Sequence, residues 1–288
     1  MKNDNLRNLI LMLLLTTLWT GCSVRSDNSA NTDNSLYKRV MQTGTIRCGY
    51  GMFPPYCMKD PNTGKLSGIF VEILDEAGKN LGLKIDWKEE VGWGSIIEGL
   101  ETGRYDLVPT GVWPNASRGR HASFSTPLFY NALNVYVRAN DHRFDNLQAI
   151  NSDKVTIATI DGYVNQEMAK SCFPKAHRLT HPDLCDGGQV FLDVATKKAD
   201  VTLNDPSLAV LFLKNNPGTI RNISKKPIAI ESNTMMFKIG EPAFKSMLDT
   251  ALTELINTGY VDKVLDKYEP GPGVYYRVAL PYQTGSPK

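Results

Sequence analysis

Segments typical of strands and of helices alternate in the first part of the globular chain, and this alternation most restricts the possible fold. Residues 45–50 (T-I-R-C-G-Y) predict a strand, and residues 69–81 repeat apolar side chains at helical spacing. Gly82 is typical of a helix end, and residues 83–88 return as a strand. A strand, a helix and a strand in this order predict a parallel sheet covered by helices.

The same cycle continues towards a short strand at 106–109. Ser95 and Glu98 stand three residues apart, which predicts a capping box at the start of a second helix. That helix is expected to end at Gly103. The short strand then runs into Thr110–Gly111, where the backbone can approach a small molecule closely.

A second α/β series of similar size follows. It is predicted to contain a strand at 155–159, helices near 165–172 and 188–198, and a strand at 200–203. Asp205-Pro206 fits the start of the next helix, with an N-cap carboxylate and proline at the first helical position.

Extended segments connect the two series. Residues 131–138 predict a strand that crosses between them, and 227–230 and 233–237 predict two further strands. Amphipathic helices are expected at 242–257 and 260–268. We therefore predict two lobes with a cleft between them: lobe 1 formed by 36–131 and 232–288, and lobe 2 formed by 132–231.

The charge balance excludes one class of function. The 288 residues include 32 basic and 30 acidic side chains, for a net charge of +2, and 42% of the residues are hydrophobic. These values are ordinary for a soluble globular protein. They give no support to nucleic-acid binding as the main role, so no nucleic acid is expected as a partner.

The N-terminus has the features of an export signal. Residues 1–21 contain Lys2, Arg7 and a short apolar run, which is the size of a signal-peptide core. Cys22 follows small residues and predicts a bacterial lipoprotein, although Trp19 stands where that pattern usually has leucine. A plain secretory peptide is the alternative, and export follows from either.

The tether and the location follow from this N-terminus. Residues 22–35 are rich in Ser, Asn and Asp and predict a flexible tether. No second long apolar run follows, so no transmembrane helix is expected after the signal. We expect an exported protein, periplasmic or at the cell surface, that a lipid on Cys22 holds at a membrane.

Four further cysteines can form disulfides in an exported protein. Four cysteines allow three pairings, and their order favours Cys48–Cys57 and Cys172–Cys185. A zinc site at Cys172, His177, His181 and Cys185 is the alternative for the second pair. Their spacing fits neither common zinc pattern closely, so we expect no metal and no cofactor.

Arg118 is the strongest single candidate for binding. It follows the glycine-ended strand by seven residues and precedes the motif F-S-T-P at Phe124. A guanidinium offers a fork of donors that matches a carboxylate. Most arginines lie on the surface, so Arg118 as a solvent-exposed side chain is the alternative.

The order of these features resembles a known family. From about Gly44 to Pro270 the chain is similar to the extracellular solute-binding proteins of polar amino-acid ABC importers. The resemblance rests on G-T-I-R-C-G-Y…P-P-Y, G-I-F-V-E-I-L, G-x-Y-D-L, R-x5-F-S-T-P, A-D-V-T-L-N-D and N-T-G-Y-V-D-K-V. It implies an α/β, two-lobed periplasmic-binding-protein fold of type II, in which each lobe is a helix-covered, mostly parallel sheet and two hinge strands join the lobes.

The resemblance also implies roles for single residues. Arg118 falls where the family binds the α-carboxylate of the ligand, and Gly111 where a backbone group meets it. Asp205 falls where a carboxylate accepts the α-ammonium, and it can cap its helix as well. Phe53 and Trp93 fall where two aromatic rings flank the ligand side chain, although packing in a core is the alternative for both.

The ends of strands add further candidates, because ligands of such sheets bind at the carboxyl ends of strands. Tyr50 and Thr110 lie at two such ends, and Asp161 lies at a third. Trp113 stands where the family usually has a Ser or Thr hydroxyl, and Asp161 falls in a position where the family usually has Gly-Thr. An extra carboxylate and a set of aromatic rings, Tyr56 among them, favour a cationic or an aromatic amino acid.

The function implied is capture without chemistry. A ligand would dock on lobe 1, lobe 2 would close over it through hinge strands near 131–135 and 232–235, and an ABC permease would recognise the closed form. We expect a monomer and no enzymatic activity, since no nucleophile elbow, zinc-protease motif or phosphate loop is found. A sensory subunit that docks on a membrane receptor, and a binder of an amine other than an amino acid, are the alternatives.

Overall fold

One continuous sheet runs through residues 35–278, which are the residues that the computed structural model describes. The main path of the sheet has the strand order β4-β1-β5-β12-β7-β10-β8-β9. These strands are β1 (Thr45–Tyr50), β4 (Lys84–Glu90), β5 (Leu107–Val112), β7 (Phe129–Arg138), β8 (Thr156–Ile160), β9 (His177–His181), β10 (Val201–Asn204) and β12 (Ala229–Lys238). Three short strands pair beside this path: β6 (Ala122–Phe124), β11 (Ile220–Asn222) and β13 (Tyr275–Arg277).

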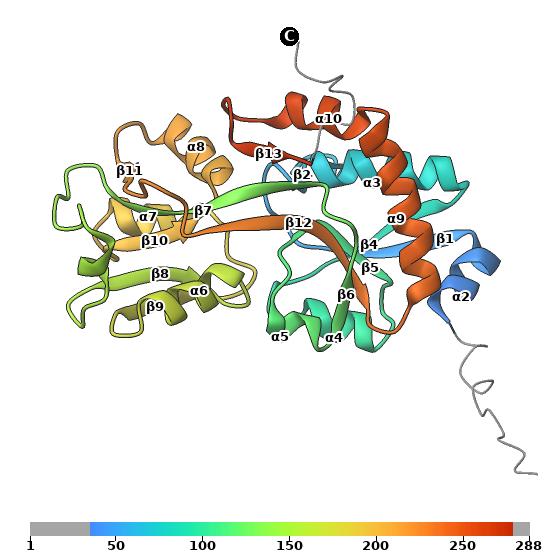
Figure 1. Cartoon of the computed structure of the whole chain (residues 1–288), viewed down its shortest axis with the longest axis horizontal. Helices are drawn as coiled ribbons and strands as arrows, with labels where there is room; N and C mark the ends of the chain where they lie inside the picture. Colours follow the sequence, from blue (N-terminus) through green and yellow to red (C-terminus); the bar gives the residue numbers. More distant parts are fainter. Residues whose placement is uncertain (1–34, 279–288) are drawn as a thin grey trace, which may run out of the picture. The chain divides into compact units, whose positions relative to one another are not determined.

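The pairing divides the sheet into two similar halves. In lobe 1, β1 pairs in parallel with β4 and β5, and β12 closes this half in antiparallel pairing with β5. In lobe 2, β8 pairs in parallel with β9 and β10, and β7 runs antiparallel to β10. Figure 1 shows lobe 2 on the left and lobe 1 on the right, with β7 and β12 crossing between them. This is the two-lobed α/β architecture expected from the sequence.

The two crossing strands are paired with each other only where they cross. Residues 229–233 of β12 pair with 129–133 of β7, and residues 234–237 of β12 then pair with β5 and β6 in lobe 1. The far half of β7 pairs with β10 and β11 in lobe 2. Each strand therefore belongs to both halves, and the short paired region is the link about which the halves can turn.

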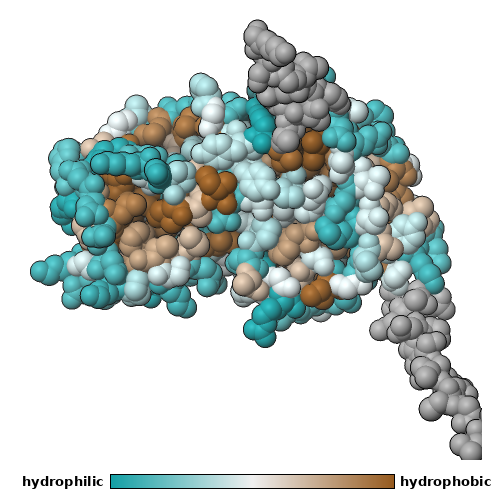
Figure 2. Space-filling model, viewed as in Figure 1, coloured by the Kyte–Doolittle hydropathy of each residue, from teal (hydrophilic) through white to brown (hydrophobic). Residues whose placement is uncertain are grey.

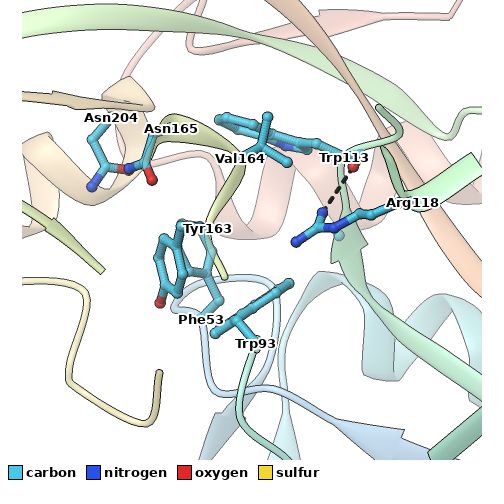
Figure 3. A pocket seen from close by; sticks show the side chains of 9 residues that line it. Phe53, Trp93, Trp113, Arg118, Tyr163, Val164, Asn165 and Asn204 are labelled. Atoms are coloured by element: carbon cyan, nitrogen blue, oxygen red, sulfur yellow. Dashed lines mark hydrogen bonds between the residues drawn. The ribbon is translucent and has the colours of Figure 1, made fainter. Parts of the chain in front are cut away.

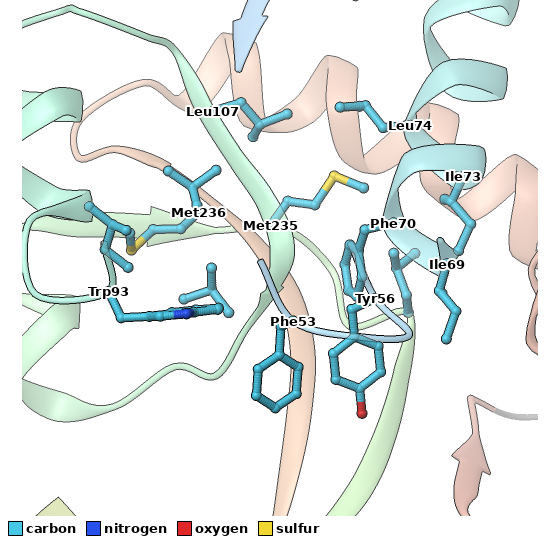
Figure 4. Packing of buried hydrophobic residues seen from close by; sticks show 14 of the residues in the cluster. Phe53, Tyr56, Ile69, Phe70, Ile73, Leu74, Trp93, Leu107, Met235 and Met236 are labelled. Carbon is cyan, nitrogen blue, oxygen red and sulfur yellow. The ribbon is translucent and has the colours of Figure 1, made fainter. Parts of the chain in front are cut away.

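Helices cover both halves of the sheet, because each helix has one apolar face that it buries against the strands. Helix α3 (Ile69–Leu81) buries its predicted face against lobe 1 and ends at Gly82, whose φ of 67° is the left-handed conformation that favours glycine. Helices α9 (Pro242–Asn257) and α10 (Tyr260–Tyr268) pack on α3. Figure 4 shows the lobe 1 core around Phe70, Leu74 and Met235. The helices of lobe 1 are α2 (Leu36–Thr43), α3 (Ile69–Leu81), α4 (Ile96–Glu101), α5 (Ala116–Gly119), α9 (Pro242–Asn257) and α10 (Tyr260–Tyr268), and those of lobe 2 are α6 (Val164–Cys172), α7 (Gln189–Ala195) and α8 (Pro206–Asn215) with the 3-10 helix η1 (Leu147–Ile150).

One buried carboxylate fixes the start of β5. Asp106 is 3% exposed, and both its oxygens accept hydrogen bonds from Arg47, whose Nη2 lies 2.8 Å from Oδ1 and whose backbone N lies 2.7 Å from Oδ2. Arg39 of helix α2 donates to the same carboxylate. Because β5 carries Gly111 at its far end, this anchor also fixes one wall of the site described below.

Several predicted bounds need correction. The segments 227–230 and 233–237 form one strand, β12, because Glu231 and Ser232 continue the pairing with β7. The predicted capping box does not form: the Ser95 hydroxyl donates to the Gly92 carbonyl and makes no side-chain cap. The short elements β2 (Met58–Lys59), β3 (Leu66–Ser67), β6, β9, β11 and β13 were not predicted.

The two predicted disulfides are wrong for this structure, in which all four cysteines are free. Strand β9 lies between Cys172 and Cys185, and its extended backbone carries the chain away from the end of α6. Cys172 borders a groove with Leu147, Phe173 and Ile228, whereas Cys185 borders another groove with Met52 and Pro54. Figure 2 shows hydrophobic residues on both halves of the face in view, with a large group on the lobe 2 half.

Cys48 and Cys57 are both buried, but they pack in different parts of lobe 1. Cys48 belongs to the main core around β1, and Cys57 belongs to a small cluster with Tyr50 and Val71. Burial raises the pKa of the Cys57 thiol to about 12 and raises that of Cys48 as well. Both are therefore neutral, unreactive core thiols.

Two further sequence inferences concern metals and membranes. Within residues 35–278, no group of three or more His, Cys, Asp or Glu side chains is placed to hold a metal ion. His177 and His181 lie on β9, and His181 pairs instead with the buried carboxylate of Asp193. No helix of the described part of the chain is long and apolar enough to span a bilayer. The predicted signal peptide and Cys22 lie outside the described residues.

Candidate functional site

A cavity lies between the two lobes, at the carboxyl ends of three strands. The space between its walls, counted with the open solvent at its mouth, is about 370 Å³. Lobe 1 and lobe 2 each supply part of the wall, as Figure 3 shows. The lining residues are Phe53, Trp93, Gly111, Trp113 and Arg118 from lobe 1, and Tyr163, Val164, Asn165 and Asn204 from lobe 2.

Arg118 is a buried cation with two backbone partners. It lies in helix α5, whose N-cap Asn115 accepts a hydrogen bond from the Arg118 backbone N at 2.7 Å. Its Nη1 donates to the Trp113 carbonyl at 2.9 Å, and its Nη2 donates to the Gly162 carbonyl of lobe 2 at 2.8 Å. Burial lowers the pKa of Arg118 to about 10, so the guanidinium stays charged near neutral pH.

The charge of Arg118 is not neutralised by a direct partner. The side chain is 7% exposed, and among the described residues no carboxylate forms an ion pair with it. A guanidinium has five N–H groups, of which the two carbonyls use two. The remaining donors make the right-hand wall of the cavity in Figure 3 a site for an anion.

Aromatic rings from both lobes form the lower wall. The ring centroid of Phe53 lies 6.0 Å from that of Trp93 and 5.9 Å from that of Tyr163, and Trp93 and Tyr163 are 5.3 Å apart. All three contacts are edge-on or tilted, as favoured between aromatic rings. These rings offer an apolar surface against which a flat or apolar group of a ligand can pack.

Several buried polar atoms around the cavity have no hydrogen-bond partner. On the wall, Asn165 donates through Nδ2 to the Leu203 carbonyl, which leaves its Oδ1 free, and Asn204 accepts through Oδ1 from the Asp205 backbone, which leaves its Nδ2 free. The hydroxyls of Tyr163 and Thr110 are also unpaired. Buried polar groups are rarely left without partners, so this concentration indicates a polar ligand in the cavity.

Asp205 lies directly behind the amide of Asn204. Its Oδ1 caps helix α8 by accepting from the backbone N of Ser207 at 2.8 Å and of Leu208 at 3.1 Å. Its Oδ2 is buried and has no partner. Burial raises the pKa of Asp205 to about 6. One oxygen therefore caps the helix, while the other has no hydrogen-bond partner among the described residues.

The sequence candidates divide into two groups. Phe53, Trp93, Gly111, Trp113 and Arg118 lie on the cavity wall. The others lie off the wall: Tyr50 packs edge-on against Trp87 with centroids 6.1 Å apart, and Thr110, Asp161 and Asp205 are not among the lining residues. Thr110 and Asp205 are nevertheless buried next to lining residues and keep an unpaired oxygen each.

Asp161 does not take the place that the ligand argument gave it. Its side chain is exposed, and its Oδ2 lies 3.6 Å from where a Cβ on Gly94 would stand, which is outside the cavity. The backbone N of Asp161 donates to the His181 carbonyl at the end of β9 at 2.9 Å. Tyr56 is fully buried in the lobe 1 core and does not face the cavity either.

The structure adds detail at two of the predicted wall residues, Trp113 and Gly111. The indole N–H of Trp113 donates to Asn233 Oδ1 at 3.0 Å, so it is not free to replace the hydroxyl donor that the family usually has there. Gly111 has a φ of 75°, and a Cβ there would stand 3.1 Å from Phe70, 3.2 Å from Tyr56 and 3.3 Å from Asn233. Glycine is thus required both by the backbone conformation and by close packing.

Sequence reasoning missed the four lining residues of lobe 2. Tyr163, Val164 and Asn165 follow Gly162 at the end of β8, and Asn204 ends β10. The rule that ligands bind at the carboxyl ends of strands pointed to both places, and it selected Asp161 and Asp205, each next to a residue that does line the cavity.

The two lobes are in direct contact beside the cavity. A Cβ on Gly162, whose φ is 76°, would stand 2.4 Å from the Gly94 backbone N and 2.5 Å from the Trp93 carbonyl carbon. Asp183 of lobe 2 accepts a hydrogen bond from the Gly94 backbone N at 3.3 Å, and it lies close against Gly92. This structure therefore shows the closed arrangement of the lobes, and glycines make the close approach possible.

Comparison with known proteins assigns the chain to a family. The sequence profile of the bacterial extracellular solute-binding proteins, family 3, matches residues 46–271. The chain belongs to this family. It is 23% identical over 263 residues to the L-cystine-binding protein TcyA of Bacillus subtilis (strain 168), an alignment that covers 90% of this chain and 95% of the relative.

Two further similarities extend this picture. The chain is 23% identical over 245 residues to the cyclohexadienyl dehydratase of Pseudomonas aeruginosa (strain PAO1), which covers 84% of this chain and 87% of that enzyme. A crystal structure of an ancestral amino acid-binding protein, described as a precursor of cyclohexadienyl dehydratase, superposes with a TM-score of 0.72 at 24% identity and covers 82% of this chain and 99% of that chain. The recognition as a solute-binding protein and the fold of type II are confirmed.

Substitution of Gly162 tests the closed contact. Gly162→Ala should hold the lobes apart, because its methyl group would overlap the Trp93–Gly94 backbone. We expect a larger radius of gyration in solution scattering than for the native protein. Gly218→Ala is the matched control, since Gly218 has a φ of 70° but nothing within 4 Å of its Cβ position. Equal radii for the two variants would contradict a contact at Gly162.

Proposed function

We propose that this protein captures an amino acid in the cavity between its lobes and delivers it to an ABC permease. The observation that carries this proposal is the buried Arg118 guanidinium, which has donors left for a carboxylate and no ion-pair partner among the described residues. Asp205 supports it from the other lobe, because its free Oδ2 suits an ammonium group. The names of relatives that bind cystine and other amino acids agree with this assignment.

The walls favour an amino acid with an uncharged side chain, aromatic rather than cationic. Arg118 is the single ionised side chain among the lining residues, and it repels a cationic group. The carboxylate of Asp161, on which the sequence argument for a cation partly rested, lies outside the cavity. Phe53, Trp93 and Tyr163 can pack against a ring, and their π faces are also the surface on which a cationic amino acid, the alternative ligand, would bind.

An enzymatic function is the second candidate, because one relative is named as a dehydratase. Dehydration needs an acid that protonates the departing hydroxyl group. Among the wall residues, Arg118 keeps its protons near neutral pH, and burial raises the pKa of Tyr163 well above its usual range, so neither is a ready proton donor. We therefore propose binding without catalysis.

A screen of ligands tests the proposal. We expect an aromatic or other uncharged L-amino acid to raise the melting temperature, since a ligand at a hundred times its Kd adds about 2.7 kcal/mol to the free energy of unfolding. Arg118→Gln should weaken binding by about tenfold to a hundredfold, the value of a charged hydrogen bond. Arg120→Gln, a neighbouring exposed arginine, is the control and should bind normally.

Other results of this screen would change the assignment. Stabilisation by lysine or arginine alone would keep the function and overturn the preferred ligand class. Conversion of a cyclohexadienyl substrate into an aromatic product, followed by ultraviolet absorbance, would show that the protein is an enzyme. Normal binding by Arg118→Gln would remove the guanidinium from the site.

The pH dependence of binding tests Asp205. Its pKa in the ligand-free protein is raised from 3.8 to about 6, so the carboxylate that would accept an ammonium is lost as pH falls through this value. The Kd should rise about tenfold between about pH 7.5 and about pH 5, when measured by calorimetry. The stability of the ligand-free fold should change in the opposite sense, because a raised carboxyl pKa makes folding more favourable as pH falls from about 6 to about 4.

Asp205→Asn is the control for this titration. Asparagine caps helices as well as aspartate does, so the helix is kept while the charge is removed. This variant should bind more weakly at pH 7.5 and should show a flat profile over the same range. A native profile that is also flat would separate Asp205 from the ligand.

Membrane attachment is part of the proposal, with the exported chain held by a lipid on Cys22. The family is extracellular, which agrees with export. Cys22→Ala should move the protein from the detergent phase to the aqueous phase in a phase-partition assay of bacterial cells, because the acyl anchor is lost. Arrival of both forms in the aqueous phase would indicate a plain secretory peptide. We further propose that the mature protein is a monomer.

A further inference from the structure

Five hydrogen bonds form an unbroken line from the cavity wall to the start of helix α8. Trp113 Nε1 donates to Asn233 Oδ1 at 3.0 Å, and Asn233 Nδ2 donates to Asn131 Oδ1 at 2.8 Å. Asn131 Nδ2 donates to the Tyr56 hydroxyl at 3.0 Å, and this hydroxyl lies 3.4 Å from the Ser207 hydroxyl. Ser207 in turn is bonded to Asp205 Oδ1. We call these six residues the hinge line.

The five hydrogen bonds of the hinge line can all have the same direction, with the donor on the Trp113 side and the acceptor on the Asp205 side. The Ser207 hydroxyl has one proton, which it can donate either to Tyr56 or to the nearby Asp205 carboxylate, and when it donates to Asp205 the Tyr56 hydroxyl can donate to Ser207. Trp113 is 9% exposed, and the other five residues are fully buried. Away from water, a chain of bonds with one direction is stronger than its separate parts, and each broken bond is costly.

The hinge line joins lobe 1, the two crossing strands and lobe 2. Trp113 and Tyr56 belong to lobe 1, Asn131 lies on β7, and Asn233 lies on β12. Ser207 and Asp205 belong to lobe 2. The bond between Tyr56 and Ser207 is the step of the line that crosses between the lobes.

The hinge line also contacts residues of the cavity wall. Gly111 packs against Tyr56 and Asn233, and Trp113 is a wall residue that Asn233 holds by its indole N–H. The ring of Tyr56 stacks on Phe53, another wall residue, at 5.2 Å between centroids. The position of the hinge and the shape of the wall are therefore set by the same contacts.

We propose that Tyr56, Asn131 and Asn233 are positioning residues that favour the closed state and shape the cavity only when the lobes are closed. None of the three lines the cavity. They act through Ser207, which completes the line on closure, and through Trp113, which the line orients. This inference rests on the proposed function, in which closure retains the ligand.

A variant of Tyr56 separates this role from packing. Tyr56→Phe keeps the ring contacts with Phe70 and Phe129, at 6.1 and 5.7 Å between centroids, and removes only the hydroxyl. Tyr105→Phe is the matched control, because Tyr105 is equally buried and its hydroxyl donates at 2.9 Å to the Ile96 carbonyl within lobe 1. Tyr105→Phe loses one buried bond within lobe 1, whereas Tyr56→Phe loses two, the bond from Asn131 and the bond that crosses to Ser207.

Single-molecule fluorescence transfer measures the result. A dye pair is placed through non-natural amino acids at Lys79 and Asp145, which are exposed on opposite lobes. We expect Tyr56→Phe to lower the ratio of closed to open molecules by about threefold to tenfold, the value of one buried hydrogen bond, both without ligand and with a mixture of the standard L-amino acids. Tyr105→Phe should leave this ratio unchanged while lowering the melting temperature.

A second variant tests the line itself. Ser207→Ala should lower the ratio as Tyr56→Phe does, and the double variant should lower it no further, because both remove the same link. The inference is overturned if Tyr56→Phe leaves the native ratio in both conditions, or if the native protein never closes. If amino acids do not change the native ratio but Tyr56→Phe still lowers it without ligand, the ligand assignment fails and the hinge line stands.

Discussion

The burial of the Arg118 guanidinium is the constraint on which the rest of the site depends. A charge in the interior is costly unless polar groups surround it, and here two backbone carbonyls, one from each lobe, supply part of that environment. The bond to Gly162 exists only when the lobes meet. A ligand carboxylate would complete what the carbonyls begin, so binding and closure would stabilise the same cation.

Closure in turn depends on backbones that approach without side chains between them. Gly162 lies against Trp93–Gly94, and Asp183 lies against Gly92 and Gly94. This explains why glycines flank Trp93: without side chains, they let lobe 2 come close enough for the indole to form a wall of the cavity. The sheet supplies the axis of the motion, because β7 and β12 each pair with both lobes.

Local chemistry made much of the fold predictable. Helices 69–81, 242–257 and 260–268 have the predicted bounds, because their apolar spacing and end residues agree. The failures are long-range. The strand β9 between Cys172 and Cys185 is exposed along much of its length and lacks a buried apolar run, so its pairing with β8 gave no local signal and two cysteines that seemed neighbours were separated.

The same distinction applies to the site. Arg118, Gly111 and Trp93 could be selected from the sequence, because each residue type, taken with its neighbours in the chain, is unusual for an ordinary surface or core position. Asn165 and Asn204 could not, since an asparagine in a first helical turn or at a strand end is ordinary until the fold buries it without a partner for one amide atom. The prediction for Asp161 was wrong for a related reason. Neighbouring residues along a turn point to different sides of the chain, and the sequence does not show which of them faces the cavity.

These placements change the argument about the ligand. A carboxylate inside the cavity would have favoured a cationic side chain, whereas an exposed one does not, because water screens it. The free amide atoms of Asn165 and Asn204 offer both a donor and an acceptor, and neither carries charge. Together with the aromatic wall, they make the cavity suited to a side chain that is neutral, and they leave the charges of the ligand backbone to Arg118 and Asp205.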